Sequence, residues 1–330
     1  MTRPIRYCHS ASLSLLTSAM SKDRAQGSFL GQLAGDALGS MVEFQSPESI
    51  QRQYPRGLRQ MADSAVWHTI AGQPTDDSEM ALMLARTLVE NGTYHVGAAL
   101  KAYQWWLHSE PFDCGATVAA GLRGHPNIDS QANGALMRIS PLGIFGSRYS
   151  LALVGEWAKQ DAILTHPHVI CQQVNALFAM AIAHAVHLQC DASRIYRHIK
   201  QWAKDMAVEP ALTRVIEEAA SEPPADYVYH QGWVLIAFQN ALFQLRNAPN
   251  LEAGVVDTIM RGGDTDTNAA ICGALLGAVY GLSAIPEQWV KCVLNCRPQA
   301  GASGVHRPRP EYLWPTDALE LAEKLLNNAP

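Results

Sequence analysis

The helical spacing of apolar residues is the feature that most constrains the fold of this 330-residue chain. Apolar side chains recur every three or four residues over 29–41, 80–88 and 96–107, which places them on one face of an α-helix. The alternation of apolar and polar residues that indicates β-strands is nearly absent. The sequence therefore predicts an all-α domain of ten or more helices. Seven further helical patterns cover 151–162, 169–188, 193–207, 232–245, 251–260, 268–282 and 317–326.

The composition limits the class of protein. Hydrophobic residues make up 48% of the chain and charged residues 17%, so much of the chain can be buried. The formal net charge is -5, and Lys and Arg form no cluster that would bind nucleic acid. Seven irregularly spaced cysteines are typical of reduced thiols, and no apolar run is suited to crossing a bilayer. We expect a cytoplasmic protein that binds neither nucleic acid nor membrane.

The N-terminal segment differs from the rest of the chain. Residues 1–20 contain basic residues and serines but no acidic residue, with a short and interrupted apolar part. This composition superficially resembles a transit peptide; a poorly ordered extension and sequence upstream of a start at Met20 are the alternatives. We predict an N-terminal extension over 1–21 that is flexible or contacts a partner. No linker divides residues 22–330, which we predict to form one domain.

Two acidic clusters stand immediately before predicted helices. The first begins at Pro74 with the sequence PTDDSE, and the second begins at Gly262 with GGDTDT. Helix capping alone explains each cluster, because Thr and Asp bind free backbone N–H groups at a helix start and acids favour the positive end of the helix dipole. Adjacent side chains on a regular helix diverge by about 100°. Both carboxylates can therefore face one point only where the chain is still leaving a loop.

Taken together, the two clusters indicate a metal centre. They offer only carboxylate and hydroxyl oxygens, which suit a hard cation such as Mg²⁺, Mn²⁺ or Ca²⁺ rather than zinc. If the two helix starts face each other, four carboxylates and two threonine hydroxyls can hold two cations. Without cations, carboxylates at this spacing repel one another and some stay protonated. Metal dependence follows if the two clusters converge.

Six sequence blocks occur in a characteristic order: GQLAGDALGSMVEF (31–44), PTDDSEMA (74–81), PFDCGATV (111–118), NGALMRISPLG (133–143), LTHPHV (164–169) and GGDTDTNAAICGALLGA (262–278). In this order they resemble the blocks of the ADP-ribosylglycohydrolase family. The combination of TDD with GGDTDTN is highly specific, whereas GDALG or HPH alone is weak. The resemblance covers about residues 25–315 and implies an all-α fold with a centre of two Mg²⁺ or Mn²⁺ ions. It also implies hydrolysis of the bond between ADP-ribose and a modified protein side chain, for which we expect arginine.

The resemblance also implies roles for individual residues. Glu43 matches a glutamate beside the cleft, and it competes with Asp113 for the role of acid or base, while Asp77 completes the implied catalytic set. His166 matches a histidine of the ADP-ribose pocket. For Glu43 and His166 the alternative is an ordinary loop residue. The implied walls for ribose and diphosphate are Asp113, Gly115, Ser130, Asn133 and Gly134. The implied metal ligands are Thr75, Asp76, Asp77, Asp264, Asp266 and Thr267.

The chain departs from the family pattern in two places. Ala132 stands where members often have glycine, so we expect the wall that receives the ribose to have a different shape. Residues 61–71 match no family block.

Three functions are compatible with these features. The first is a metal-dependent hydrolase acting on ADP-ribosylated protein. The second is an immunity or inhibitory protein that binds an ADP-ribosyltransferase toxin, as well as or instead of hydrolysing its product. The third is a catalytically silent structural member similar to a lens crystallin. The complete set of oxygen ligands argues against the third, because a structural protein does not need it.

Overall fold

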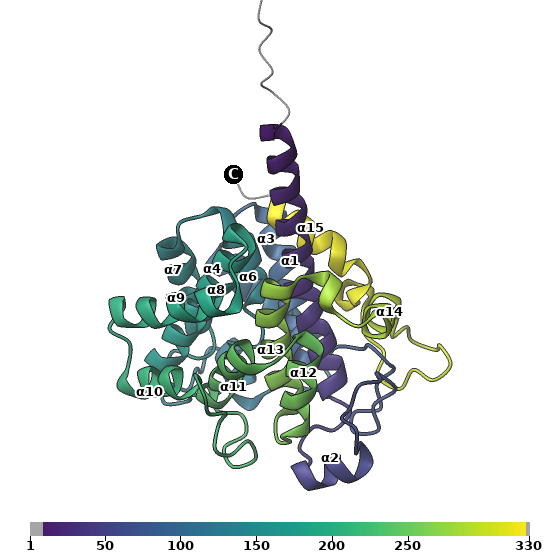
Figure 1. Ribbon diagram of the computed structural model, residues 1–330. Helices are drawn as coiled ribbons and strands as arrows, with labels where there is room; N and C mark the ends of the chain where they lie inside the picture. Colours follow the sequence, from purple (N-terminus) through teal and green to yellow (C-terminus); the bar gives the residue numbers. More distant parts are fainter. Residues whose placement is uncertain (1–8, 328–330) are drawn as a thin grey trace, which may run out of the picture.

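The computed structural model describes residues 9–327, which form fifteen α-helices and four short 3₁₀-helices (Figure 1). Within this range there is no β-strand, and one isolated β-bridge joins Ala132 to Trp233. The predicted all-α class is confirmed. The helices are α1 (His9–Gly39), α2 (Pro47–Gln53), α3 (Asp76–Asn91), α4 (Val96–His108), α5 (Ala116–Leu122), α6 (Ser140–Phe145), η1 (Gly146–Arg148), α7 (Leu151–Ile163), α8 (Val169–Leu188), α9 (Ala192–Asp205), α10 (Pro210–Glu218), α11 (Val234–Asn247), α12 (Leu251–Met260), α13 (Thr265–Tyr280), η2 (Leu282–Ala284), α14 (Glu287–Asn295), η3 (Glu311–Leu313), η4 (Pro315–Asp317) and α15 (Ala318–Asn327).

The long helices coincide with the segments that carry a helical apolar pattern. The helices that the pattern did not predict are α2, α5, α6, α10 and α14, which contain six to nine residues each. So short a segment makes at most two or three turns, which is too few for the periodicity of its apolar residues to stand out.

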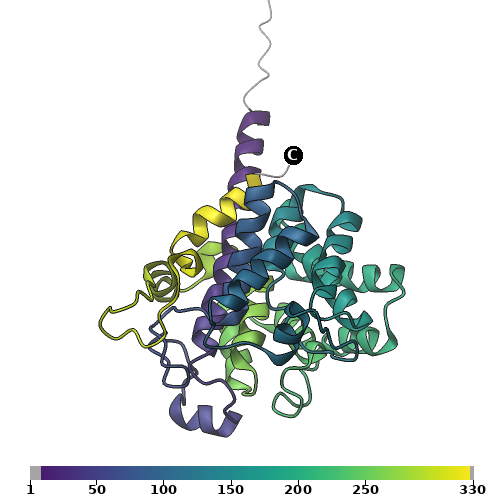
Figure 2. The ribbon, with the colours of Figure 1, turned by 180° about the vertical axis from the view of Figure 1, so that it is seen from behind.

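Helices α1 and α13 run antiparallel through the centre of the molecule, and their backbones are in direct contact (Figures 1 and 2). A Cβ atom added to Gly31 would lie 2.3 Å from the carbonyl oxygen of Gly273, and one added to Gly35 would lie 2.1 Å from that of Ala269. No side chain fits at these distances, so the glycines allow the close approach. Glycines recur on α1 every four residues, at 27, 31, 35 and 39, a pattern that our sequence analysis did not use.

This contact brings the end of α1 to the start of α13. The Thr265 hydroxyl donates a hydrogen bond of 2.8 Å to the carbonyl of Gly39. Beyond α1, the backbone N–H of Phe44 donates to the carbonyl of Gly263 over 2.8 Å, and the N–H of Gly263 donates to Gln45 over 3.0 Å. The second acidic cluster is therefore fixed to the residues that follow α1.

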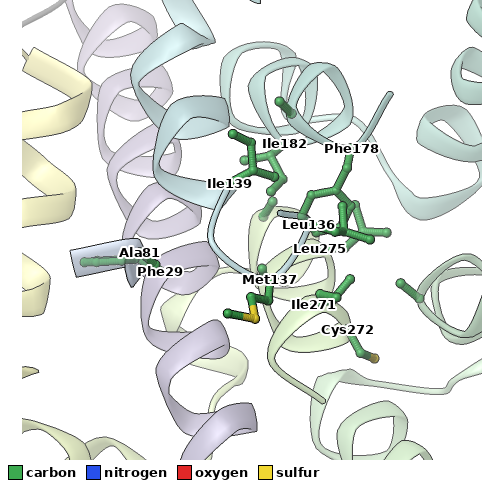
Figure 3. Packing of buried hydrophobic residues seen from close by; sticks show 14 of the residues in the cluster. Phe29, Ala81, Leu136, Met137, Ile139, Phe178, Ile182, Ile271, Cys272 and Leu275 are labelled. Atoms are coloured by element: carbon green, nitrogen blue, oxygen red, sulfur yellow. The ribbon is translucent and has the colours of Figure 1, made fainter. Parts of the chain in front are cut away.

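The hydrophobic core extends through most of the helices, and α8 and α13 both contribute to it. The segment before α6 contributes side chains that lie between α8 and α13 (Figure 3). In the described part of the chain, α8 alone is long and apolar enough to cross a membrane, and 78% of its apolar window is buried inside the protein. Burial of that extent is what a core helix shows. The labelled residues of this region are Leu136, Met137, Ile139, Phe178, Ile182, Ile271, Cys272 and Leu275.

The predicted domain boundary at residue 21 falls inside α1. Residues 1–8 lie outside the described residues, and the helix is continuous from His9 to Gly39. The hydroxyl of Ser21 donates a hydrogen bond of 2.9 Å to the carbonyl of Val186 in α8. The division of the chain at this point stays a prediction.

Replacing Gly31 by alanine is expected to lower the free energy of unfolding by about 2 kcal/mol or more, because the added methyl group overlaps the backbone of α13. Helix propensity alone would change the stability by about 1 kcal/mol in the opposite direction. Gly97→Ala in α4 is the matched control, since a Cβ there meets no atom within 4 Å. Urea denaturation measures both variants. Equal stability of the two variants would contradict the proposed contact.

Candidate active site

The two acidic clusters meet at one cavity. It has a volume of about 240 Å³ and lies between the first turns of α3 and α13. Asp76 and Asp77 reach it from α3, whereas Asp264, Asp266 and Thr267 reach it from α13. The hydroxyl of Thr267 donates to Oδ2 of Asp77 over 3.3 Å, which links the clusters directly.

Capping does not account for these side chains. Neither Thr75 nor Asp264, the residues at the two N-cap positions, makes a side-chain capping hydrogen bond. The Thr75 hydroxyl instead lies 2.9 Å from Oδ1 of Asp36 and donates to it. Oδ2 of Asp264 accepts a hydrogen bond of 2.7 Å from Asn133. Both clusters are therefore held by residues from distant parts of the chain.

Asp36 is a site residue that the sequence analysis missed. It belongs to α1 and is fully buried. Its carboxylate accepts hydrogen bonds from the backbone N–H groups of Thr75 at 3.2 Å and Ser78 at 3.1 Å. Asp36 thus satisfies the free N–H groups at the start of α3 from a neighbouring helix. The available signal was a single acidic residue in the stretch 27–39, which has no other charged residue and is rich in glycine, because such an acid is rarely buried without a partner.

The carboxylates form two groups with the arrangement of a cation site. One oxygen each from Asp36, Asp77 and Asp266 lies within 4.8 Å of the others, and the same holds for Glu43, Asp264 and Asp266. Oδ1 of Asp77 is buried and has no hydrogen-bond partner. An all-oxygen donor set with an unpartnered buried oxygen fits a hard divalent cation.

The remaining predicted ligands lie next to these groups. Asp76 lines the cavity but accepts a 3.3 Å hydrogen bond from the N–H of Gly115, so it faces the loop that carries Asp113. Thr75 is buried behind the cavity, with its hydroxyl 3.2 Å from Asp77.

Burial and mutual repulsion disfavour the charged forms of these acids. Burial, followed by repulsion from neighbouring carboxylates, raises the pKa of Asp77 and of Asp266 well above the ordinary value. Burial also raises the pKa of Asp36 to about 7. For Glu43, burial and then the charges of Asp264 and Asp113 raise the pKa to about 8. The close carboxylates therefore retain protons near neutral pH when no cation is bound.

Glu43 is held by a residue from the segment that matched no family block. Nε1 of Trp67 donates a hydrogen bond to Oε2 of Glu43. The indole ring lies 5.9 Å, between centroids, from the ring of Phe112, which is next to Asp113. Trp67 was missed because nothing in the local sequence connects it with a carboxylate 24 residues earlier.

The opposite wall of the cavity comes from the segments predicted to bind substrate. Gly115, Asn133, Gly134 and His166 all line the cavity. Ser130 is not among the lining residues; its hydroxyl lies 3.0 Å from that of Thr117, which does line the cavity. Ala132, at the position where family members often have glycine, lines the cavity as well.

His166 carries an unused hydrogen-bonding atom. Arg138 donates to the hydroxyl of Thr165 over 2.9 Å, and this hydroxyl lies 2.8 Å from Nδ1 of His166. With the hydroxyl donating to Nδ1, the ring proton is on Nε2, which is buried and has no partner. Burial, followed by the charge of Arg138, lowers the pKa of His166 to about 3, so the ring is neutral. His166 is therefore a neutral donor beside the cavity.

Comparison with known proteins identifies the family. The sequence profile of the ADP-ribosylglycohydrolase family matches residues 17–329. The chain belongs to the ADP-ribosylglycohydrolase family. The predicted family and enzyme class are thereby confirmed.

Individual members of the ADP-ribosylglycohydrolase family align over most of the chain. ADP-ribosyl-[dinitrogen reductase] glycohydrolase of Rhodospirillum rubrum is 30% identical over 288 residues, which cover 83% of this chain and 92% of that protein. ADP-ribosylarginine hydrolase Tri1 of Pseudomonas putida strain GB-1 is 26% identical over 332 residues, covering 96% and 81%. A solved ADP-ribosylglycohydrolase-related protein complex has the same fold, with a TM-score of 0.78 and 24% identity over 94% of this chain and 100% of that chain.

For this glycohydrolase we expect stability to depend on pH and divalent cations together. An acid whose pKa is higher in the folded protein binds more protons when folded, so stability falls as pH rises between the unfolded and folded values. That window runs from the ordinary value of 3.8 for Asp and 4.5 for Glu to about 7 for Asp36 and about 8 for Glu43. Bound cations remove the need for these protons.

The measurement is the unfolding temperature, in EDTA and in Mg²⁺ or Mn²⁺, at about pH 5 and about pH 8. In EDTA the unfolding temperature should be lower at about pH 8 than at about pH 5. The cation should raise the unfolding temperature more at about pH 8 than at about pH 5. An equal cation effect at both pH values would contradict the carboxylate assignment.

Proposed function

We propose that this enzyme hydrolyses the N-glycosidic bond that joins ADP-ribose to an arginine side chain of a protein. The observation that carries the proposal is the convergence of two three-carboxylate groups and the neutral donor His166 on one cavity. The names of the relatives from R. rubrum and P. putida, which describe hydrolysis of ADP-ribosyl adducts, support it.

The carboxylates are proposed to hold two divalent cations, Mg²⁺ or Mn²⁺. The residues that would hold them are the two groups that share Asp266, together with the hydroxyls of Thr75 and Thr267. Cations bound there would supply Lewis acidity and positive charge toward the oxygens of the ribose.

The chain's own residues account for the other requirements of the reaction. Cleavage of a glycosidic bond builds positive charge on the anomeric carbon, which nearby carboxylates stabilise. The Nε2–H of His166, and the backbone of Gly115 and Gly134, which line the cavity, would bind and orient the ADP-ribose.

Proton transfer to the departing guanidine falls to Glu43 or Asp113. Glu43 belongs to one of the two three-carboxylate groups, whereas Asp113 belongs to neither. Asp113 therefore keeps a free carboxyl group when the cations are bound. Burial raises its pKa, which favours a role as proton donor. We assign the proton transfer to Asp113, and Glu43 would instead be a ligand of one of the cations.

No separate observation favours either alternative, the toxin-binding protein or the structural protein. The relatives named above are described as hydrolases, so they do not support a toxin partner for this chain. The complete carboxylate groups also argue against a silent structural role, because burying them together is costly unless a ligand is bound.

The decisive measurement is release of free ADP-ribose from an arginine-ADP-ribosylated protein. Wild-type protein should release it in Mg²⁺ or Mn²⁺ but not in EDTA. Asp77→Asn should lower the rate by about 100-fold, since it removes a charged ligand without changing the size of the side chain. The matched control is Asp257→Asn in α12, which changes a partly exposed acid that pairs with Arg261 and does not line the cavity.

Circular dichroism of both variants verifies that the helices are retained. If well-folded wild-type protein releases no ADP-ribose with any divalent cation, the arginine linkage is excluded. Serine and asparagine linkages would then be tested with the same pair of variants.

A further inference from the structure

Arg309 is the centre of a buried hydrogen-bond cluster outside the cavity. It lies in the segment between α14 and η3, and its side chain is 3% exposed. The guanidinium forms a two-pronged ion pair with Glu79 of α3: Nε lies 2.7 Å from Oε1 and Nη2 lies 2.9 Å from Oε2. Nε1 of Trp106 in α4 donates to the same Oε2 over 2.7 Å. Glu79 lies one turn after Asp76, so this cluster adjoins the cation-binding end of α3.

The other N–H groups of Arg309 bind the chain at the end of α4. Nη1 donates to the carbonyl of Ser109 over 2.8 Å and to that of Glu110 over 3.1 Å. Nη2 donates to the hydroxyl of Ser109 over 2.7 Å. Every N–H group of the guanidinium therefore has an acceptor, in the fixed fork that only arginine offers.

Glu110 has an uncommon backbone conformation. Its φ is +55°, in the left-handed region that costs a residue other than glycine about 1 kcal/mol or more. The carbonyl of this residue is one of the acceptors of Arg309. The left-handed residue turns the chain from α4 into the segment 111–115, which contains Asp113.

The loop 109–115 is attached to α3 at both ends. At its start, Ser109 and Glu110 are joined through Arg309 to Glu79. At its end, the N–H of Gly115 donates to Asp76. The first turn of α3 therefore serves as a common support for the loop and for the cation ligands.

We propose that Arg309 is a positioning residue that holds the loop 109–115, and with it Asp113, in place against the cation-binding turn of α3. The role of Asp113 in this statement rests on the proposed function. The attachment of the loop to the first turn of α3 does not rest on the proposed function. Its effect on the cation ligands is measured separately, by the affinity for a cation.

The test compares Arg309→Met with Arg86→Met in the full-length protein. Arg86 also joins α3 to the C-terminal segment, through Asp317 at 2.7 Å and the carbonyl of Tyr312 at 2.9 Å. Arg86 lies seven residues after Glu79, about two turns further along α3, and does not contact the loop 109–115. Both variants lose an ion pair on the same helix, and only the first releases the loop. A role limited to stability predicts similar effects of the two changes.

We expect Arg309→Met to lower kcat by about 10- to 100-fold with little change in KM, because the loop and its carboxyl group lose their fixed position. The affinity for Mn²⁺, measured by titration calorimetry, should fall by about tenfold. Arg86→Met should stay within about threefold of wild type in both quantities. Equal kcat and Mn²⁺ affinity in the two variants would overturn the proposal.

Two further comparisons keep the test decisive, one for the case that Arg309→Met does not fold and one for the case that the proposed function fails. If Arg309→Met does not fold, Arg309→Lys keeps the charge beside Glu79 but loses the fork to Ser109 and Glu110. Wild-type kcat and Mn²⁺ affinity in the lysine variant would overturn the proposal, and the losses given above would support it. If wild-type protein releases no ADP-ribose, the proposed function fails, while the comparison of Mn²⁺ affinities still decides whether Arg309 positions the loop.

Discussion

The contact between α1 and α13 is the interaction on which the rest of the structure depends. Glycines remove the side chains that normally keep two helices apart, so that backbone meets backbone along the pair. Because the helices are antiparallel, the end of α1 and the start of α13 coincide. Asp36 and Glu43 come from the first helix and its continuation, and Asp264 and Asp266 from the second. The hydrogen bonds that Asp36 accepts hold the start of α3 next to these two helices.

The site gathers acids in a place where acids are unfavourable. Each carboxylate loses hydration, and each is close to another carboxylate of the same charge. The fold tolerates this because the surrounding helices are fixed by interactions that do not involve the acids, including the hydrophobic core around α8 and the buried ion pair of Arg138 with Asp161. Stability supplied elsewhere therefore maintains a cluster that is unfavourable by itself.

The sequence predicted those features whose cause is local. The long helices were predicted from the spacing of their own apolar residues. The acidic clusters were predicted from residues only a few positions apart. Glu43, Asp113, Asn133 and His166 were found only through a resemblance to known blocks. The structure brings them to one cavity, while their individual roles remain predictions.

The features that sequence analysis missed depend on partners far along the chain. Asp36 binds Thr75, 39 residues away, and Trp67 binds Glu43 across a segment without a recognisable pattern. Arg309 binds Glu79 at a separation of 230 residues. An isolated arginine or tryptophan in a loop can have many different partners, and only the three-dimensional structure shows which partner it binds. The same holds for the short helices, whose stability comes from packing rather than from their own sequence.

The glycine repeat of α1 has a consequence for the alignment of the two central helices. A repeat of four residues looks the same after a shift of four residues, or about 6 Å along the axis, so glycines alone do not select one alignment over the next. Two hydroxyl groups break this degeneracy: Ser28 donates to the carbonyl of Ala274 over 3.0 Å, and Thr265 donates to that of Gly39 over 2.8 Å. These two polar contacts act together with the backbone hydrogen bonds of Gly263 to Phe44 and Gln45. Together they favour the alignment in which Asp36 lies beside Asp266 over one that is shifted by one turn.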